Sequence, residues 1–115
     1  MIHRLAVAAL LTIPFATAVA CSSSAPSCDA PTATSTVEMQ ENLFAPACAQ
    51  VHATDTLTIV NHDDIPHTYT VKSTDVNVKL EGGATATAAL TGIAPGTYAV
   101  TCLYHPQMTA TLRLD

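Results

Sequence analysis

One short motif near the end of the chain constrains its fold more than any other feature. Residues 102–108 read Cys-Leu-Tyr-His-Pro-Gln-Met, so Cys102, His105 and Met108 lie three residues apart on one loop. A fourth side chain that can bind a metal, His67, lies far upstream in the sequence. If the four side chains bind one ion, the loop and the segment at His67 must meet in space. We therefore expect His67 to come from a separate strand.

The four side chains supply one thiolate, two imidazoles and one thioether. In a blue-copper site two His and one Cys form a trigonal plane, and Met is a long, weak axial ligand. Soft sulfur suits Cu(I) and imidazole suits either oxidation state, so little rearranges when an electron moves. Zinc sites usually close with four Cys or His ligands, and an isolated Cys or Met is most often part of a core. The combination favours copper over zinc and over no metal.

Two stretches of the chain resemble the cupredoxins. Residues 61–68 read Asn-His-Asp-Asp-Ile-Pro-His-Thr, and residues 98–108 read Tyr-Ala-Val-Thr-Cys-Leu-Tyr-His-Pro-Gln-Met. The short Cys-x-x-His-x-x-Met loop is most similar to that of amicyanin, and the resemblance to this amicyanin- or plastocyanin-like class covers residues 34–115. It implies a Greek-key β-sandwich that carries single electrons between a donor and an acceptor protein and is not an enzyme.

The resemblance also implies roles for individual residues. One copper ion per chain would have His67, Cys102 and His105 as equatorial ligands and Met108 as the axial ligand. His105 resembles the ligand that faces solvent in such proteins, through which electrons enter and leave.

Two neighbours of the first His are expected to influence the site. The carbonyl of Pro66 stands where, in some relatives, a carbonyl approaches the copper. Thr68 stands where many cupredoxins have an Asn that ties the two ligand loops together. A hydroxyl can donate one hydrogen bond and accept others, but it reaches less far than an amide side chain. This departure therefore bears on the rigidity of the loop and on the reduction potential.

The start of the chain reads as an export signal. A short basic segment and an apolar stretch precede the small residues of Ala18-Val19-Ala20, which is typical of a secretory signal peptide over residues 1–20. Residues 18–21 also resemble a bacterial lipobox, in which Cys21 would become the lipidated N-terminal residue. This predicts a periplasmic or cell-surface protein held to the membrane by a lipid anchor. The alternative is an ordinary cleavage site followed by a chance Cys.

Two further cysteines, Cys28 and Cys48, have no role in the copper site or the anchor. An exported protein reaches a compartment that permits disulfides. We therefore hypothesise a Cys28–Cys48 disulfide that pins the N-terminal segment to the sandwich. The alternative is two unpaired thiols, which an oxidising compartment disfavours.

The chain changes character near residue 35. Residues 21–35 are rich in Ser, Ala, Pro and Thr, which predicts a flexible tether. Residues 36–115 contain short alternating segments separated by turn residues, which predicts one all-β domain of about eight strands. The predicted strands are 36–40, 48–52, 56–61, 67–72, 76–80, 84–90, 97–102 and 109–114.

The phase of this alternation predicts where the ligands lie. Side chains two residues apart in a strand share a face. Cys102 is therefore in phase with Val100 at the end of its strand, and His67 is in phase with Tyr69 at the start of another. This phasing lets the two ligands meet at one end of the sandwich.

The formal net charge of −5 bears on possible partners. An acidic chain without a basic patch argues against nucleic acid and favours redox partners with a positive docking surface; we expect a monomer. A copper-sequestering or copper-delivering lipoprotein is the alternative function, and extra exposed Met or His residues would favour it. In the mature chain only Met39, His52 and His62 lie outside the site, and both His are expected in exposed turns or strands.

Overall fold

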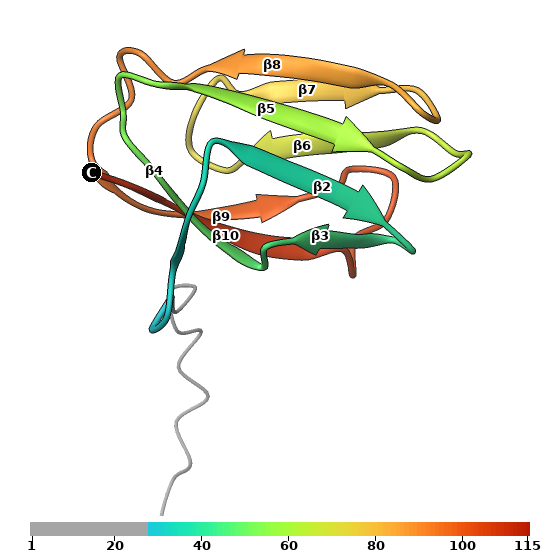
Figure 1. The fold of residues 1–115 in the computed structure, drawn as a ribbon, viewed down its shortest axis with the longest axis horizontal. Coiled ribbons are helices and arrows are strands. Elements are labelled where there is room, and N and C mark those ends of the chain that lie inside the picture. Colours follow the sequence, from blue (N-terminus) through green and yellow to red (C-terminus); the bar gives the residue numbers. More distant parts are fainter. Residues whose placement is uncertain (1–27) are drawn as a thin grey trace, which may run out of the picture.

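A computed structural model describes residues 28–115 of the chain. These residues form ten strands in two sheets, with no helix among them (Figure 1). The six-stranded sheet has the order β1-β4-β10-β9-β6-β7, and the four-stranded sheet has the order β3-β2-β5-β8. This all-β sandwich confirms the predicted fold class. The strands are β1 (Thr32–Ala33), β2 (Thr36–Gln40), β3 (Leu43–Ala45), β4 (Cys48–Val51), β5 (Thr56–Asn61), β6 (His67–Val71), β7 (Asn77–Leu80), β8 (Thr85–Ala89), β9 (Gly96–Thr101) and β10 (Thr109–Leu114).

Alternation of apolar and polar residues explains where most strands form. In β5 the side chains of Leu57, Ile59 and Asn61 are buried, while the residues between them are partly exposed. One face of the strand thus packs in the core and the other meets solvent. All eight predicted strands are present as β2 and β4–β10, and β2, β5 and β10 have the predicted bounds.

Two strands were not predicted from the sequence. β3 pairs with β2 through a tight turn in which Glu41 and Asn42 have positive φ angles of 55° and 60°. Such turns usually contain an Asn-Gly or Asp-Gly pair, which this turn lacks. β1 pairs in parallel with β4, with Thr32 opposite Ala49. The last part of the predicted tether thus pairs with the sandwich, because main-chain pairing orders residues that have little apolar surface.

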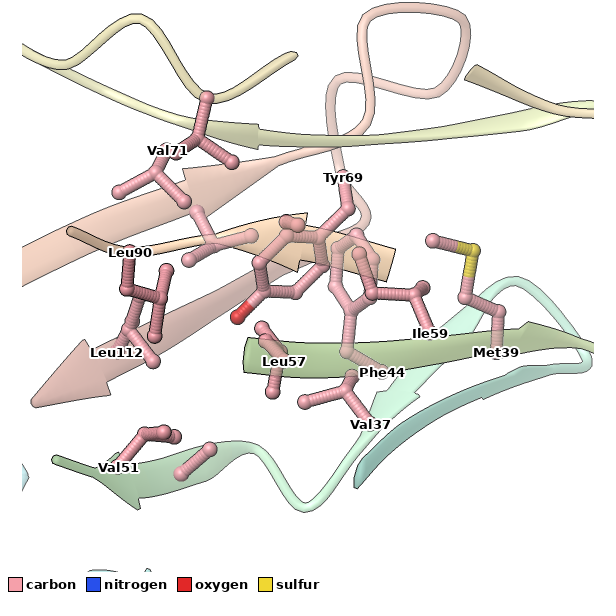
Figure 2. Packing of buried hydrophobic residues seen from close by; sticks show 14 of the residues in the cluster. Val37, Met39, Phe44, Val51, Leu57, Ile59, Tyr69, Val71, Leu90 and Leu112 are labelled. Carbon is pink, nitrogen blue, oxygen red and sulfur yellow. The ribbon is translucent and has the colours of Figure 1, made fainter. Parts of the chain in front are cut away.

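The core lies between the two sheets. Leu57 and Ile59 of β5 and Tyr69 and Val71 of β6 belong to one core cluster, and all four are buried (Figure 2). The ring of Tyr69 packs edge-on against Phe44 of β3, with centroids 5.5 Å apart. Burial raises the pKa of Tyr69 above its usual range. With few aromatic residues available, aliphatic side chains from both sheets fill most of the interior.

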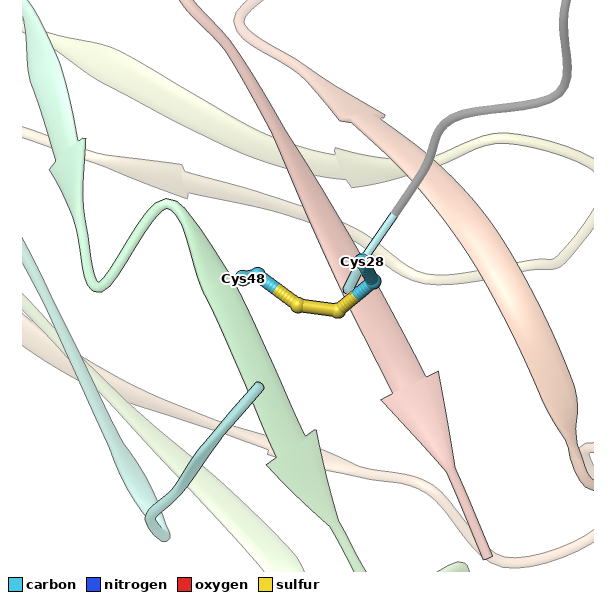
Figure 3. Close-up of a disulfide and its surroundings, with 2 residues drawn as sticks. All are labelled: Cys28 and Cys48. Atoms are coloured by element: carbon cyan, nitrogen blue, oxygen red, sulfur yellow. A yellow bond between two sulfur atoms is a disulfide. The ribbon is translucent and has the colours of Figure 1, made fainter. Parts of the chain in front are cut away.

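A disulfide joins the start of the described chain to the sandwich. Cys28 and Cys48 are bonded, with their Cα atoms 5.7 Å apart, so the segment before β1 is attached to the first residue of β4 (Figure 3). The predicted signal peptide, Cys21 and the first part of the predicted tether lie outside the described residues. Within residues 28–115 there is no helix of the length and apolarity needed to cross a membrane.

Candidate metal centre

The topology brings the four predicted ligands to one end of the sandwich. His67 is the first residue of β6, Cys102 directly follows β9, and Met108 directly precedes β10. β6 and β9 are antiparallel neighbours, with Thr70 opposite Thr101. The start of β6 therefore lies beside the end of β9, where the β9–β10 loop begins (Figure 1). The prediction that His67 comes from a separate strand is confirmed.

Three donor atoms face one another at this end. His67 Nδ1 lies 3.2 Å from His105 Nδ1 and 3.8 Å from Cys102 Sγ, and Cys102 Sγ lies 3.6 Å from His105 Nδ1. Nitrogen and sulfur ligands that lie about 2.0 and 2.3 Å from a metal ion are themselves roughly 3 to 4 Å apart. The three atoms are thus spaced as ligands of a single ion.

The surroundings of the donors match a sulfur-rich copper site. His67, Cys102 and Met108 are buried, whereas His105 is partly exposed. In blue-copper sites, two imidazoles and a thiolate bind the copper in one plane, and a thioether binds weakly from the side. This donor set suits copper in both oxidation states. His67, Cys102, His105 and Met108 are positioned as a type 1 copper site.

Backbone hydrogen bonds within the ligand loop determine its shape. The Cys102 amide donates to the carbonyl of Met108 over 3.0 Å, and the Met108 amide donates to the carbonyl of His105 over 2.8 Å. The His105 amide donates back to the carbonyl of Cys102 over 3.3 Å. Pro106, which follows His105, has a restricted backbone. These contacts join three ligands into one compact turn.

Sequence reasoning missed Asp63, whose carboxylate orients the first ligand. Asp63 Oδ2 accepts a hydrogen bond from His67 Nε2 over 2.7 Å, which leaves the Nδ1 lone pair of His67 facing the other ligands. A metal-binding His commonly donates its second N–H to a carboxylate in this way. The spacing of the two residues, four apart in the sequence, was the only available signal.

Asp63 also connects the site to the β2–β3 turn. Its Oδ1 accepts from the Glu41 amide over 2.7 Å, and its Oδ2 accepts from the Asn42 amide over 3.1 Å. The hydrogen bond from Asn42, followed by that from His67, lowers the pKa of Asp63. The carboxylate therefore stays ionised and links one sheet to a ligand of the other.

Buried Asn61 holds Asp63 in place. Its side-chain oxygen accepts from the Asp63 amide over 3.0 Å, and its Nδ2 donates to the carbonyls of Ile65 and Glu81 over 2.9 and 3.0 Å. An Asn side chain that bonds the backbone two residues on is the usual Asx turn. Next to it, a Cβ atom at Gly82 would collide with the carbonyl oxygen of Asp64. The β5–β6 loop and the β7–β8 turn are thus closely packed against each other.

Thr68 holds the ligand loop from two directions. Its backbone amide donates to Cys102 Sγ over 3.3 Å, and its hydroxyl oxygen accepts from the Leu103 amide over 2.8 Å. The hydroxyl thus ties β6 to the loop directly, and it does so as an acceptor from a backbone amide. The Thr side chain is shorter than the Asn that many cupredoxins have at this position, but it reaches the loop because Thr68 is buried in the sheet beside the loop.

These contacts also control the charge of Cys102. Burial by itself would raise the pKa of the thiol, but hydrogen bonds from the Thr68 amide and from the imidazole of His105 oppose it. The net result is a pKa lowered to about 6. The site therefore favours the thiolate, which is the form that binds metal.

The remaining predicted residues lie away from this centre. His52 pairs with Asp115 over 2.8 Å, and His62 lies 3.4 Å from Glu38; both His side chains are exposed, as expected. Cys28 and Cys48 are in the disulfide, so Cys102 is the free cysteine of the described residues.

The β-sandwich with a His-Cys-His-Met centre at one end defines a type 1 copper protein. Comparison with protein families gives the same class: the model of the cupredoxin-like domain matches residues 8–112. The chain therefore belongs to the cupredoxin-like domain family. Comparison with curated proteins finds no match.

Solved structures with a similar fold come from several kinds of copper protein. A Cu-containing nitrite reductase from Thermus scotoductus SA-01 is 26% identical with a TM-score of 0.60; the match covers 70% of this chain and 22% of that one. This chain thus spans less than a quarter of that enzyme's length. A purple cupredoxin from Nitrosopumilus maritimus is 17% identical with a TM-score of 0.60, over 70% and 98% of the two chains. A reduced amicyanin mutant is 19% identical with a TM-score of 0.60, over 70% and 80%.

Proposed function

We propose that this protein carries single electrons between redox partners outside the cytoplasm. In this proposal His67, Cys102 and His105 are the equatorial ligands of one copper ion and Met108 is the axial ligand. The observation that supports it best is the convergence of two imidazole nitrogens and a thiolate sulfur within 3.8 Å of one another. When bound, copper supplies the one-electron couple between Cu(I) and Cu(II).

The protein's contribution to this function is to keep the ligands still. Asp63 fixes the imidazole of His67, and Thr68 fixes Cys102 and the loop after it. Ligands that are already in place need little movement when the charge of the metal changes. All buried side-chain polar atoms in residues 28–115 have hydrogen-bond partners, so the site has no unsatisfied group that would favour rearrangement.

The surface around His105 supports contact with a partner protein. Among the described residues, four large apolar side chains are exposed. They are Leu103 and Tyr104 of the ligand loop, Ile65 of the β5–β6 loop, and Leu43 after the β2–β3 turn. A shallow pocket between residues 41–43 and residues 104–108 includes His105. Two of these side chains, Leu43 and Tyr104, line that pocket with His105, and exposed apolar patches often mark interaction sites. A partner docked here would lie against the partly exposed ligand.

The proposed location rests on the N-terminal sequence and on the disulfide. A Cys28–Cys48 bond persists in an oxidising compartment and is rare in the cytosol. We propose that the signal peptide of residues 1–20 directs export, and that lipid on Cys21 holds the domain at the membrane. The short chain between Cys21 and Cys28 would then keep the monomeric domain close to the lipid surface.

We propose that the protein acts as an electron carrier with no enzymatic activity of its own. Four protein ligands leave no open coordination position for a substrate, whereas catalytic metal sites keep one. The known enzyme in the comparison, a nitrite reductase, is a much longer chain.

Voltammetry of the copper-loaded mature protein tests the proposal. Reversible cycling, with copper retained through many scans, is the expected result. Irreversible loss of the metal on reduction would contradict electron transfer and favour a copper-delivering or copper-sequestering lipoprotein.

A further inference from the structure

We propose that Thr70 and Asn77 are positioning residues for the copper centre, and that they act through Thr68. This inference rests on the proposed function, because it concerns how the ligand loop is held in an electron carrier. Neither residue contacts a ligand. Both lie in a row of hydrogen bonds that starts at the ligand loop and ends at the edge of the six-stranded sheet.

The row has three successive contacts. The Leu103 amide donates to Thr68 Oγ1 over 2.8 Å. Thr68 Oγ1 lies 2.9 Å from Thr70 Oγ1, and the Thr70 hydroxyl donates to Asn77 Oδ1 over 2.9 Å. Leu103 directly follows Cys102 in the chain, so the first contact holds the peptide group attached to the thiolate ligand.

The donors and acceptors fix the direction of the row. The Thr70 hydroxyl donates its one proton to Asn77, so Thr68 must be the donor in the hydrogen bond between Thr68 and Thr70. This turns the lone pairs of Thr68 towards the Leu103 amide. Hydrogen bonds in such a chain polarise one another, so each contact strengthens the next.

The strand geometry explains why these residues are aligned. Thr68 and Thr70 lie two apart in β6, on the face opposite His67 and Tyr69. Asn77 of β7 is directly opposite Thr70 in the register. β7 is the edge strand of its sheet, and Asn77 is exposed there. A polar row thus runs along the outer face while the ligand and the core side chains occupy the inner one.

Loss of the Thr70 hydroxyl would affect the loop through Thr68. Thr68 is buried, with 3% of its surface exposed, so its hydroxyl cannot readily turn to water. Without Thr70 as acceptor it must rotate to find another partner. Rotation moves its lone pairs away from the Leu103 amide and loosens the peptide beside Cys102.

Amide hydrogen exchange on the copper-free protein tests this directly. Thr70→Val keeps the shape of the side chain and removes the hydroxyl. We expect exchange at the Leu103 amide to become about threefold to tenfold faster, which corresponds to the loss of one ordinary hydrogen bond. Exchange at Val100, a buried residue of β9, serves as the reference for global stability. Thr70→Ser restores the hydroxyl and should restore the wild-type rate.

A second reading uses the copper-loaded protein. The visible thiolate-to-copper band should shift in Thr70→Val and return in Thr70→Ser, because a purely structural role in the sheet would not move it. Asn77→Ala, at an exposed position, should produce a smaller change in the same direction. Thr97→Val, a matched loss of an exposed hydroxyl in β9, should change neither measurement.

Wild-type exchange at Leu103 in both Thr70→Val and Asn77→Ala would overturn the inference. The exchange experiment contains no metal and no redox step. Failure of the proposed electron-transfer function would therefore appear in voltammetry, while failure of the hydroxyl row would appear in exchange.

Discussion

Asp63 offers the sharpest test of how the protein controls its first ligand. The substitution Asp63→Asn removes the negative charge and keeps the size of the side chain. At present one carboxylate oxygen serves both His67 and Asn42, and the other serves Glu41. An amide has only one oxygen. If that oxygen stays with His67, the amide NH₂ must face the N–H group of Glu41, and two donors oppose each other.

The size of the effect follows from the contact with His67. A hydrogen bond to a charged group contributes about 1.5–3 kcal/mol. The Asp63 side chain is 17% exposed, so water can replace part of the lost interaction. We therefore expect the lower end, about 1.5 kcal/mol, which is roughly a tenfold loss of Cu(II) affinity. Mutation of a residue that hydrogen-bonds to a metal ligand typically lowers metal affinity by about ten- to a hundredfold. The reduction potential should rise, because the lost negative charge favoured Cu(II).

Competition with a chromophoric Cu(II) chelator measures the affinity, and voltammetry measures the potential. Asp64→Asn is the matched control, since it removes the same charge from an exposed neighbour for which the described residues provide no side-chain hydrogen bond. Asp63→Ala, which removes all three contacts, should weaken binding further than Asp63→Asn. Equal affinities for Asp63→Asn and Asp64→Asn would refute the reasoning, because charge alone would then account for the change.

Three further outcomes are expected. Cys102→Ser should abolish the intense visible colour even if copper still binds to the two His; a persistent band in its absorption spectrum would exclude Cys102 as a ligand. Met108→Leu should raise the reduction potential with the colour retained and Met108→Gln should lower it; an unchanged potential in both, by voltammetry, would place another residue in the axial position. In the copper-free protein, thiolate absorbance of Cys102 should appear as the pH rises through about 6. Because this folded-state pKa is below the ordinary value, the thiolate's contribution to stability is fully present above the ordinary thiol pKa and is lost as the pH falls through about 6; a midpoint near the ordinary value would contradict the hydrogen bonding described for Sγ.

Much of the fold was predictable because each signal was local. Turn residues separate the strands, and alternation assigns each strand an inner and an outer face. The ligand types predicted that His67 and Cys102 meet, and the phase of the alternation allowed it, since both are in line with buried neighbours at strand ends. By contrast, β1 depends on pairing with β4, and β3 depends on a hairpin with β2 whose turn lacks the usual glycine, so neither has a strong pattern of its own. Backbone pairing of this kind leaves little trace in side-chain composition.

The contacts that hold the ligands were harder to predict for a related reason. Asp63 reads as part of a polar turn, and its role depends on the β2–β3 turn, which donates two amides to it from more than twenty residues away. Thr68 was expected to reach less far than the Asn of many cupredoxins. Its position in a buried strand beside the loop, with Thr70 and Asn77 behind it, allows a short side chain to make the contact. The ligands can be recognised from residue types, whereas their rigidity depends on which strands lie side by side. A copper site transplanted with only its four ligands would therefore lack the contacts that limit their movement.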